Sequence, residues 1–274
     1  MQFDSAGHLI CPVCSAPLAK EGKSLICEHR HTYDIAKAGY VNLHITSSQR
    51  QSGDSKEMAA ARTAFLDTGA YAPFMEEIRR CAREYSERGV LVDAGCGEGY
   101  YTAALARDFD ETYGFDLSKA SCAAAAKRAR AEGVGERCHI GVASVYSMPV
   151  ADGCADCVTN IFAPCAEEEY SRVLGEGGIL IVACAGTRHL EGLKGVLYEE
   201  IRENAERADL PSGMERICVQ HVSYSITLSS PEEIKNLYMM TPYCYRTAIE
   251  SQEKLLALES LETLVDFDIH VYRK

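Results

Sequence analysis

Residues 90–106 read VLVDAGCGEGYYTAALA, and this stretch predicts the fold of the larger part of the chain. An apolar run ends around Asp93, three glycines follow at alternate positions, and a helical pattern begins after the last of them. Glycine lets a backbone turn sharply and approach a ligand closely, and the first turn of a helix offers free N–H groups. Gly95, Gly97 and Gly99 are therefore predicted to form a ligand-binding turn between a strand and a helix.

The spacing of these glycines separates two kinds of nucleotide-binding turn. The dinucleotide fingerprint is G-x-G-x-x-G, with a pyrophosphate resting on the following helix. Here the third glycine comes one residue early, and Asp93 precedes the first glycine. This variant, D-x-G-x-G-x-G, is similar to the first motif of the S-adenosylmethionine (SAM)-dependent methyltransferases, whose cofactor has no pyrophosphate.

An acidic residue follows at the distance expected for the next strand. Residues 112–118 read TYGFDLS, which puts Asp116 19 residues beyond Gly97. An acid at the end of the second strand can accept hydrogen bonds from both hydroxyls of a ribose. We therefore predict Asp116 as a cofactor-binding residue, and we include Asp93 and Ser144 in the same predicted set.

Strand-like and helix-like segments alternate after the glycine turn. Strands are predicted over 137–149, 156–164, 177–186, 217–228 and 264–274, and the clearest helices over 119–133 and 166–174. Such alternation predicts helices on both faces of a doubly wound sheet, with ligands at the carboxyl ends of the strands. The predicted fold class is α/β, a class I (Rossmann-like) SAM-dependent methyltransferase with a mixed sheet. The competing interpretation is an unrelated α/β domain that carries a glycine-rich turn.

A dense set of metal-competent residues lies near the N-terminus, in CPVCSAPLAKEGKSLICEHRH (residues 11–31). The pattern is Cys11-x2-Cys14, a gap of twelve residues, and then Cys27-x3-His31. Two thiolates can clasp one ion from a tight turn, and a second turn can supply the other two ligands of a tetrahedral zinc site. The spacing predicts a structural Zn2+ held by these four residues, and the alternative is a group of ordinary buried thiols.

Other cysteine and histidine residues are weaker candidates. His29 is a rival to His31 as the fourth ligand, although the x3 spacing favours His31. Cys154 and Cys157 form a second Cys-x-x-Cys pair, but a pair alone leaves the coordination of a metal incomplete. The chain has 13 cysteines and no visible export signal. Most of the cysteines are therefore predicted to be reduced thiols in a cytoplasmic protein.

The charge of the chain is unevenly distributed. A net charge of −12 argues against a general nucleic-acid binder, which is usually basic. Residues 1–60 nevertheless carry six basic and six acidic side chains, so the excess negative charge lies in the other 214 residues. Any contact with a polyanion would favour the N-terminal segment or a local patch elsewhere. No stretch approaches the roughly 18 uninterrupted apolar residues of a membrane span.

With a zinc segment and a methyltransferase core on one chain, the sequence resembles the bacterial 23S rRNA (guanine-N1)-methyltransferases. The likeness covers nearly the whole length and rests on these strings: CPVC…CEHRH, YDIAKAGYVNL, GDSKEMAAARTAFLDTGAY, DAGCGEGYYT, GFDLSKA, IFAPC, TRHLEGLKG and MMTP. Several of them are specific to this family. The resemblance implies methylation of N1 of a guanine in a 23S rRNA hairpin, with SAM as the cofactor.

The resemblance also implies particular cofactor contacts. They are Tyr71 in TGAY, Gly97 and Glu98 in the glycine turn, Asp116, and His189 in TRHL. Tyr71 and His189 follow from the matching strings alone, since no spacing rule points to them.

In this family the zinc module lies beside the catalytic domain and is thought to recognise the rRNA hairpin. Lys20, Lys23, Arg30 and Lys37 of this segment are predicted to be exposed and to contact phosphates, although they could equally form a solvated face. The resemblance leaves the oligomeric state open, and a homodimer could cradle one hairpin.

The chain is accordingly divided into three parts. Residues 1–45 form the zinc-binding RNA-recognition module, and residues 58–274 form the methyltransferase domain. Residues 46–57 are predicted to be a flexible linker, because the text TSSQRQSGDSK is polar and rich in Ser, Gln and Gly. A helix is expected to follow over residues 57–69.

The catalytic residues are not evident from the sequence. The stretch from Asn160 to Pro164 follows the fourth strand, where related base methyltransferases grip a planar substrate, and its backbone carbonyls could hold the guanine edge. The family often carries an aromatic residue where Cys244 stands in MMTPYCYRTA. If that aromatic stacks on the base, Tyr243 or Tyr245 would have to replace it here. By default, however, such a Met- and Tyr-rich run packs in the core.

Two other functions remain open from the sequence. A methyltransferase acting on a small metabolite, with a purely structural zinc site, would show the same sheet motifs. A non-catalytic binding module that keeps the fold is opposed by the intact glycine turn and by Asp116.

Overall fold

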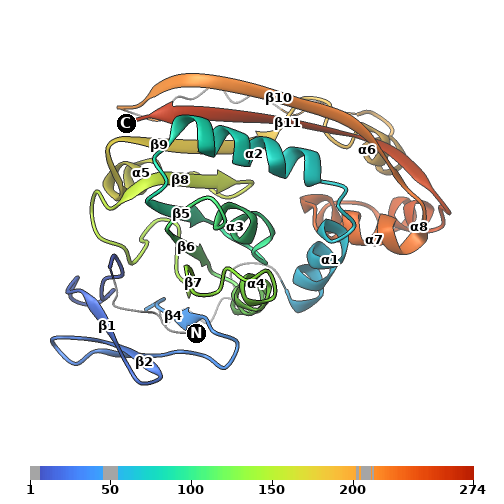
Figure 1. Cartoon of the computed structure of the whole chain (residues 1–274). Coiled ribbons are helices and arrows are strands. Elements are labelled where there is room, and N and C mark those ends of the chain that lie inside the picture. Colours follow the sequence, from blue (N-terminus) through green and yellow to red (C-terminus); the bar gives the residue numbers. More distant parts are fainter. Residues whose placement is uncertain (1–6, 46–54, 202–203, 205–210, 212) are drawn as a thin grey trace.

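The computed structural model describes residues 7–45, 55–201, 204, 211 and 213–274 (Figure 1). Its large sheet contains β4 (Val41–Asn42), β5 (Val90–Ala94), β6 (Glu111–Asp116), β7 (Cys138–Val142), β8 (Ala155–Ile161), β9 (Leu174–Ala185), β10 (Glu215–Leu228) and β11 (Leu261–Arg273). The strand order is β10-β11-β9-β8-β5-β6-β7-β4. The strands from β4 to β9 run parallel to their neighbours, whereas β11 is antiparallel to β9 and β10 is antiparallel to β11. The predicted doubly wound, mixed sheet is therefore confirmed.

The helices are α1 (Lys56–Leu66), α2 (Ala72–Tyr85), α3 (Tyr100–Leu105), α4 (Lys119–Ala131), α5 (Glu167–Val173), α6 (Glu191–Leu197), α7 (Pro231–Met239), the 3-10 turn η1 (Pro242–Tyr245) and α8 (Ile249–Leu256). Helices α1, α6, α7 and α8 gather at the end of the sheet towards which the parallel strands point (Figure 1). In the part of the chain that the structure describes, no helix is long and apolar enough to cross a membrane.

Local sequence explains why several helices begin where they do. The Ser55 hydroxyl accepts a hydrogen bond from the Met58 N–H and caps α1, and the Ser118 hydroxyl caps α4 in the same way. At α7, the Ser230 hydroxyl accepts from the Glu233 N–H while the Glu233 carboxylate accepts from the N–H of Ser229, the residue before the N-cap, an arrangement that resembles a capping box. Helix α1 therefore begins within the predicted linker, and residues 46–54 of that linker lie outside the described residues.

The N-terminal segment forms a second, three-stranded antiparallel sheet. Its strands are β1 (Leu18–Glu21), β2 (Ser24–Cys27) and β3 (Thr32–Asp34). Gly22, with φ of +63°, allows the tight turn between β1 and β2. The chain then joins the large sheet through β4, which pairs with β7.

The zinc segment and the large sheet share one hydrophobic core. Buried Leu25 and Leu43 of the N-terminal segment belong to the same cluster of apolar side chains as Phe115 of β6 and Val150. A segment of this size buries too little surface to fold on its own. We infer that the large sheet and a bound metal together supply what the small segment lacks.

A substitution at Gly99 tests how closely the glycine turn before α3 packs against α4. Its φ is +87°, and a Cβ there would lie 2.7 Å from Cα of Ala125 on α4, so both strain and overlap oppose a side chain. We expect Gly99→Ala to lower the free energy of unfolding by about 2–4 kcal/mol in urea denaturation. Gly133→Ala is the matched control, because φ is +76° but nothing lies within 4 Å, and we expect a loss of about 1–2 kcal/mol. Equal losses in the two variants would show that the overlap with α4 is relieved at no cost.

Candidate functional site

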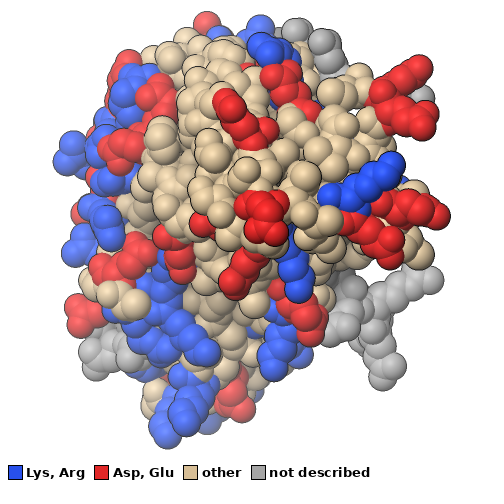
Figure 2. Space-filling model, turned by 90° about the vertical axis from the view of Figure 1, so that its right-hand side faces the viewer, with Lys and Arg blue, Asp and Glu red and all other residues tan. Residues whose placement is uncertain are grey.

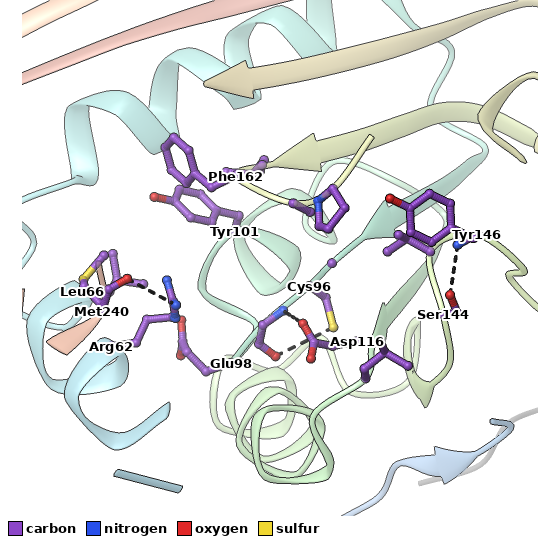
Figure 3. Close-up of a pocket in the computed structure, with 17 residues that line it drawn as sticks. Arg62, Leu66, Cys96, Glu98, Tyr101, Asp116, Ser144, Tyr146, Phe162 and Met240 are labelled. Atoms are coloured by element: carbon purple, nitrogen blue, oxygen red, sulfur yellow. Dashed lines mark hydrogen bonds between the residues drawn. The ribbon is translucent and has the colours of Figure 1, made fainter. Parts of the chain in front are cut away.

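A cavity of about 290 Å3 opens at the carboxyl ends of β5, β6 and β8 (Figure 3). Residues from six segments line it: Arg62 and Leu66 of α1, the turn from Gly95 to Glu98 with Tyr101, Asp116 and Leu117, Ser144 to Tyr146, Ile161 to Pro164, and Met240. The cavity lies where the strand order reverses between β5 and its two neighbours, β6 and β8, the usual position of a ligand in a doubly wound sheet.

The three glycines of the turn meet different requirements. A Cβ on Gly95 would lie 2.4 Å from Cβ of Ala163, and Gly99 is packed against α4. Gly97 has φ of +53°, lines the cavity, and has nothing within 4 Å of the position of a Cβ. The space above Gly97 is therefore free for a bound molecule, as close approach of a cofactor to the backbone requires.

Asp116 lies at the end of β6 and joins the turn to the floor of the cavity. One carboxylate oxygen accepts from the Gly97 N–H at 3.2 Å, and the other accepts from the Ser118 N–H at 2.7 Å. A carboxylate oxygen can accept more than one hydrogen bond, so both oxygens retain capacity for ribose hydroxyls. The residues present thus fit the adenosyl part of SAM.

Asp93 supports the turn from beneath and does not line the cavity. It is 2% exposed, and its carboxylate accepts hydrogen bonds from the hydroxyls of Thr102 on α3 (2.5 Å) and Thr159 on β8 (2.8 Å). Burial raises the pKa of Asp93 to about 6, although both hydroxyls oppose this shift. The side chain is therefore committed to holding β5, α3 and β8 together.

Glu98 lines the cavity, but its charge is already balanced. Its carboxylate lies 2.7 Å from Nη2 of Arg128 on α4, and it also accepts from the Tyr100 N–H at 3.1 Å. Burial raises the pKa of Glu98, and the charge of Arg128 works against that rise. A cofactor contact through the Glu98 backbone or side chain stays a prediction.

The turn after β8 combines strain with an exposed aromatic ring. Phe162 has φ of +56° and is 43% exposed, and its ring lies 5.6 Å from the ring of Phe74. Asn160 is buried behind this turn, where its side-chain N–H donates to the Pro164 carbonyl at 2.9 Å; the Tyr170 hydroxyl donates to the same carbonyl at 2.9 Å. The Pro164 carbonyl, one of the predicted grips on guanine, is thus occupied by the protein, and Asn160 positions the turn.

Tyr71 and His189 lie together, but in an aromatic cluster that does not line the cavity. Their ring centroids are 6.4 Å apart, and Phe267 of β11 packs against both rings at 5.1 and 4.3 Å. Burial lowers the pKa of His189 to about 3, and its Nδ1 accepts from the Asp266 N–H at 3.3 Å, so the ring is neutral. The cofactor contacts implied for both residues stay predictions.

Several cavity residues escaped the sequence analysis. Arg62 and Tyr101 carry no spacing signal, because α1 and α3 reach the cavity only through the tertiary fold. Phe162 lies in the stretch whose backbone carbonyls were predicted to hold the guanine edge, but no role was predicted for its ring. In the Met- and Tyr-rich run, Met240 lines the cavity and Tyr245 is 71% exposed, so the run is only partly core.

The four predicted zinc ligands converge on one point. The sulfur and nitrogen atoms of Cys11, Cys14, Cys27 and His31 all lie within 4.8 Å of one another. The Cys14 and Cys27 sulfurs are 3.7 Å apart, and the Cys27 sulfur is 3.4 Å from Nδ1 of His31. Ligands at tetrahedral Zn–S and Zn–N distances would be separated by about 3.8 and 3.6 Å, so the donor set fits Zn2+. His29 is not part of this cluster.

The surroundings of Cys11 favour its thiolate. Burial opposes ionisation, but the Tyr33 hydroxyl, 3.1 Å from the sulfur, and the backbone N–H groups of Val13 and Cys14 lower the pKa of Cys11 to about 6. A thiolate is the form that binds zinc. In the second pair, by contrast, burial raises the pKa of Cys154 to about 11 and that of Cys157 further still, in keeping with inert thiols. None of the thirteen cysteines, all of which the structure describes, forms a disulfide.

Exposed cations gather near the zinc module. Lys23, Arg30 and Lys37 are exposed, whereas Lys20, predicted to be exposed, is half-buried. Further exposed cations lie on α4, among them Lys119 and Lys127. Figure 2 draws the face that lies on the right-hand side of Figure 1. Several Lys and Arg side chains lie low on that face, at the height of the zinc module and α4, whereas acidic side chains are frequent above them.

Comparisons with known proteins agree with this geometry. Residues 9–45 match a family model described as the RlmA N-terminal zinc ribbon, and residues 91–178 match that of a methyltransferase domain. With the cavity, the glycine turn and the strand order, these matches define a class I SAM-dependent methyltransferase with an N-terminal zinc ribbon.

The chain belongs to the 23S rRNA (guanine-N1)-methyltransferase family. It is 37% identical over 199 residues to the 23S rRNA (guanine(748)-N(1))-methyltransferase of Streptomyces fradiae, which covers 70% of this chain and 69% of the relative. A putative 23S rRNA (guanine-N(1)-)-methyltransferase of Micromonospora griseorubida is 34% identical over 76% of this chain and 77% of its own length. A Bacillus subtilis protein with the same putative assignment is 28% identical over 96% of both chains. The family resemblance and the SAM and zinc cofactors are thus confirmed.

Substitution of one predicted zinc ligand tests the metal site separately from the rest of the fold. We expect Cys14→Ser to lower zinc affinity by about 100-fold or more, because three ligands no longer close the tetrahedron. Metal content by mass spectrometry and competition with a chromogenic chelator measure this loss. Cys154→Ser is the control, since this half-buried thiol lies outside the cluster and should retain one zinc per chain. Full zinc retention in Cys14→Ser would contradict the assignment.

Buried His189 predicts a pH dependence of stability. Because burial lowers its folded-state pKa to about 3, only the unfolded chain takes up this proton as the pH falls below about 6.5. The free energy of unfolding should therefore fall with pH, by about 2 kcal/mol between pH 7 and pH 5 for this group. In His189→Gln this part of the difference should vanish. Urea denaturation at both pH values measures it, and His44→Gln controls for loss of an imidazole elsewhere; an unchanged pH 7–5 difference in His189→Gln would refute the assignment.

Proposed function

We propose that this protein methylates N1 of a guanine in a hairpin of 23S rRNA. Family membership supports the reaction and the class of RNA. The observation that carries the proposal for this chain is the fixed placement of the zinc module beside the cavity. Strand β4 runs parallel to β7, and the Leu43 N–H donates to the Val142 carbonyl at 2.9 Å. Strand β7 ends at Val142, two residues before Ser144, which lines the cavity, so the zinc module is joined to a strand that leads to the cavity.

This placement gives the two parts of the chain separate tasks. The exposed cations of the zinc module and α4 would contact phosphates, which position an RNA without reading its sequence. An unpaired nucleotide of the loop could then reach the cavity, since an enzyme that modifies a base must receive it outside the stack. In this view the zinc module selects the hairpin and the cavity selects the base.

When SAM is bound, it would supply a methyl group on a sulfonium, which is already activated for transfer. The protein must hold the guanine N1 in line with that methyl group. As the N1–carbon bond forms and the sulfur–carbon bond breaks, the N1 proton must also pass to a side chain or to water. We assign the exposed ring of Phe162 as the surface on which the base rests, because it lines the cavity and its backbone is held in a left-handed conformation. The carbonyls of Phe162 and Ala163 would face the guanine edge, since that of Pro164 accepts hydrogen bonds from Asn160 and Tyr170.

Tyr243 and Tyr245 are the other aromatic candidates. Tyr243 is half-buried, with its ring 6.1 Å from that of Tyr198, whereas Tyr245 is 71% exposed. Tyr245 could stack on a neighbouring nucleotide, but neither ring lines the cavity. A cytoplasmic location follows from the rRNA substrate and is part of the proposal, and a homodimer that cradles one hairpin stays a prediction.

The test is methylation of 23S rRNA. Unmodified rRNA is incubated with the protein and labelled SAM, and the position of the methyl group is mapped by mass spectrometry of nuclease fragments. We expect one methyl group on N1 of one guanine. Tight SAM binding without incorporation into rRNA would favour the small-metabolite methyltransferase, whereas undetectable SAM binding would favour a non-catalytic module.

Charge removal on the zinc module should weaken RNA binding. In Lys23→Gln/Lys37→Gln, two phosphate contacts are lost, so hairpin affinity at physiological salt should fall about 10- to 30-fold and the salt dependence should flatten. Filter binding at several salt concentrations measures both effects. The matched control, Arg216→Gln/Arg273→Gln, removes two exposed cations from β10 and β11 at the opposite edge of the sheet. Equal losses in the two double variants would mean that the zinc module has no special role.

A further inference from the structure

The two ends of the cavity differ in charge. On one side of Asp116 and Cys96, the cavity is lined by Ser144, Val145 and Tyr146, none of which carries a charge at neutral pH. On the other side it is lined by Arg62, Leu66, Glu98, Tyr101 and Met240. Figure 3 shows this separation, with Tyr146 and Ser144 at one end and Arg62 and Met240 at the other.

This asymmetry matches the distribution of charge in SAM. The ribose lies in the middle of the molecule, with the uncharged adenine on one side and the methionyl group, which carries a carboxylate and an ammonium, on the other. With the ribose at Asp116, the adenine fits the uncharged end near Ser144. The methionyl group then passes the glycine turn and enters the charged end.

A carboxylate in this end of the cavity needs a cation, and the described residues offer one. Among the described residues that line the cavity, Arg62 is the single Lys or Arg. Arg128 lies behind Glu98 and is engaged by Glu98 and Asp67 at 2.7 and 2.8 Å. His189 is neutral, since burial lowers its pKa to about 3.

The hydroxyl of Tyr101 is a second donor at the same end. It is buried and has no hydrogen-bond partner within the described part of the protein, which is unfavourable for a polar group. Figure 3 shows this hydroxyl directed towards the side of the cavity where Leu66 and Met240 lie. An acceptor bound there would satisfy it.

We propose that Arg62 binds the carboxylate of the methionyl group of SAM, with the Tyr101 hydroxyl as an additional donor. A guanidinium presents paired N–H donors whose geometry suits a carboxylate. Arg62 is placed for this by α1, which packs against α7, and its Nη2 lies 3.5 Å from the Met240 carbonyl at the end of α7. The next residue, Thr63, lies 3.5 Å from the Glu98 carboxylate, which places α1 beside the glycine turn.

The test compares two ligands that differ in the methionyl group. S-adenosylhomocysteine retains the carboxylate, whereas 5′-methylthioadenosine keeps the adenosine and sulfur and lacks it. Calorimetry without RNA gives the dissociation constant of each ligand for the wild type and for Arg62→Met. We expect Arg62→Met to bind S-adenosylhomocysteine about 10- to 100-fold more weakly and 5′-methylthioadenosine unchanged within about twofold. Tyr101→Phe should show the same selectivity with a loss of about two- to tenfold.

Each other outcome overturns the assignment. Equal losses for both ligands would mean that Arg62 supports the cavity only structurally, through α7. Unchanged binding of both ligands would assign Arg62 to the substrate instead. Arg107→Met, which removes an exposed arginine outside the cavity, should bind both ligands as the wild type does. Because no RNA is present, the result is independent of whether the proposed rRNA substrate is correct.

Discussion

The carboxylate of Asp93 connects the three elements on which the cavity depends. It lies at the end of β5, and it accepts hydrogen bonds from Thr102 on α3 and Thr159 on β8. Burying a charge is costly, and hydrogen bonds to a charged group, each worth about 1.5–3 kcal/mol, offset much of that cost. Burial raises its pKa to about 6, so the side chain is still ionised at neutral pH. An ionised acceptor can hold both hydroxyls, and this fixes the strand and the helix between which the glycine turn must pass.

The glycines follow from this constraint. With both ends of the turn fixed, residues 95–99 have a short path, and the backbone must take positive φ at Gly95, Gly97 and Gly99. Gly95 and Gly99 are further restricted by Ala163 and Ala125, which leave no room for a Cβ. Gly97 alone faces open space, and the Asp116 carboxylate holds its N–H. One buried acid that does not itself line the cavity thus determines the shape of the turn that does.

The sequence predicts those parts of the molecule that depend on local pattern. The glycine turn, the strands around it and the Cys-x2-Cys…Cys-x3-His spacing each require particular residues at short range, so their geometry could be inferred before the fold was known. Arg62 and Phe162 could not be found in this way. Arg62 comes from a helix that precedes β5 in the chain and reaches the cavity by packing against α7, and Phe162 owes its position to a turn braced by Asn160 and Tyr170. The buried position of Asp93 beneath the turn could not be predicted either, because an aspartate at this point of the motif is compatible with a cofactor contact and with hydrogen bonds inside the protein.

The acidic character of the chain bears on how an RNA would approach it. A polyanion is repelled by most of a surface that carries a net charge of −12, and this repulsion acts before any contact forms. The neutral N-terminal segment and the exposed cations of α4 depart from this acidic character, and the zinc module is tied to the sheet through β4 and a shared core. In the proposed complex, repulsion elsewhere would orient the RNA as much as attraction at this surface would. If the proposed function is correct, an acidic protein could be selective for RNA in this way: its charge would disfavour non-specific binding, and the zinc module would supply the permitted orientation.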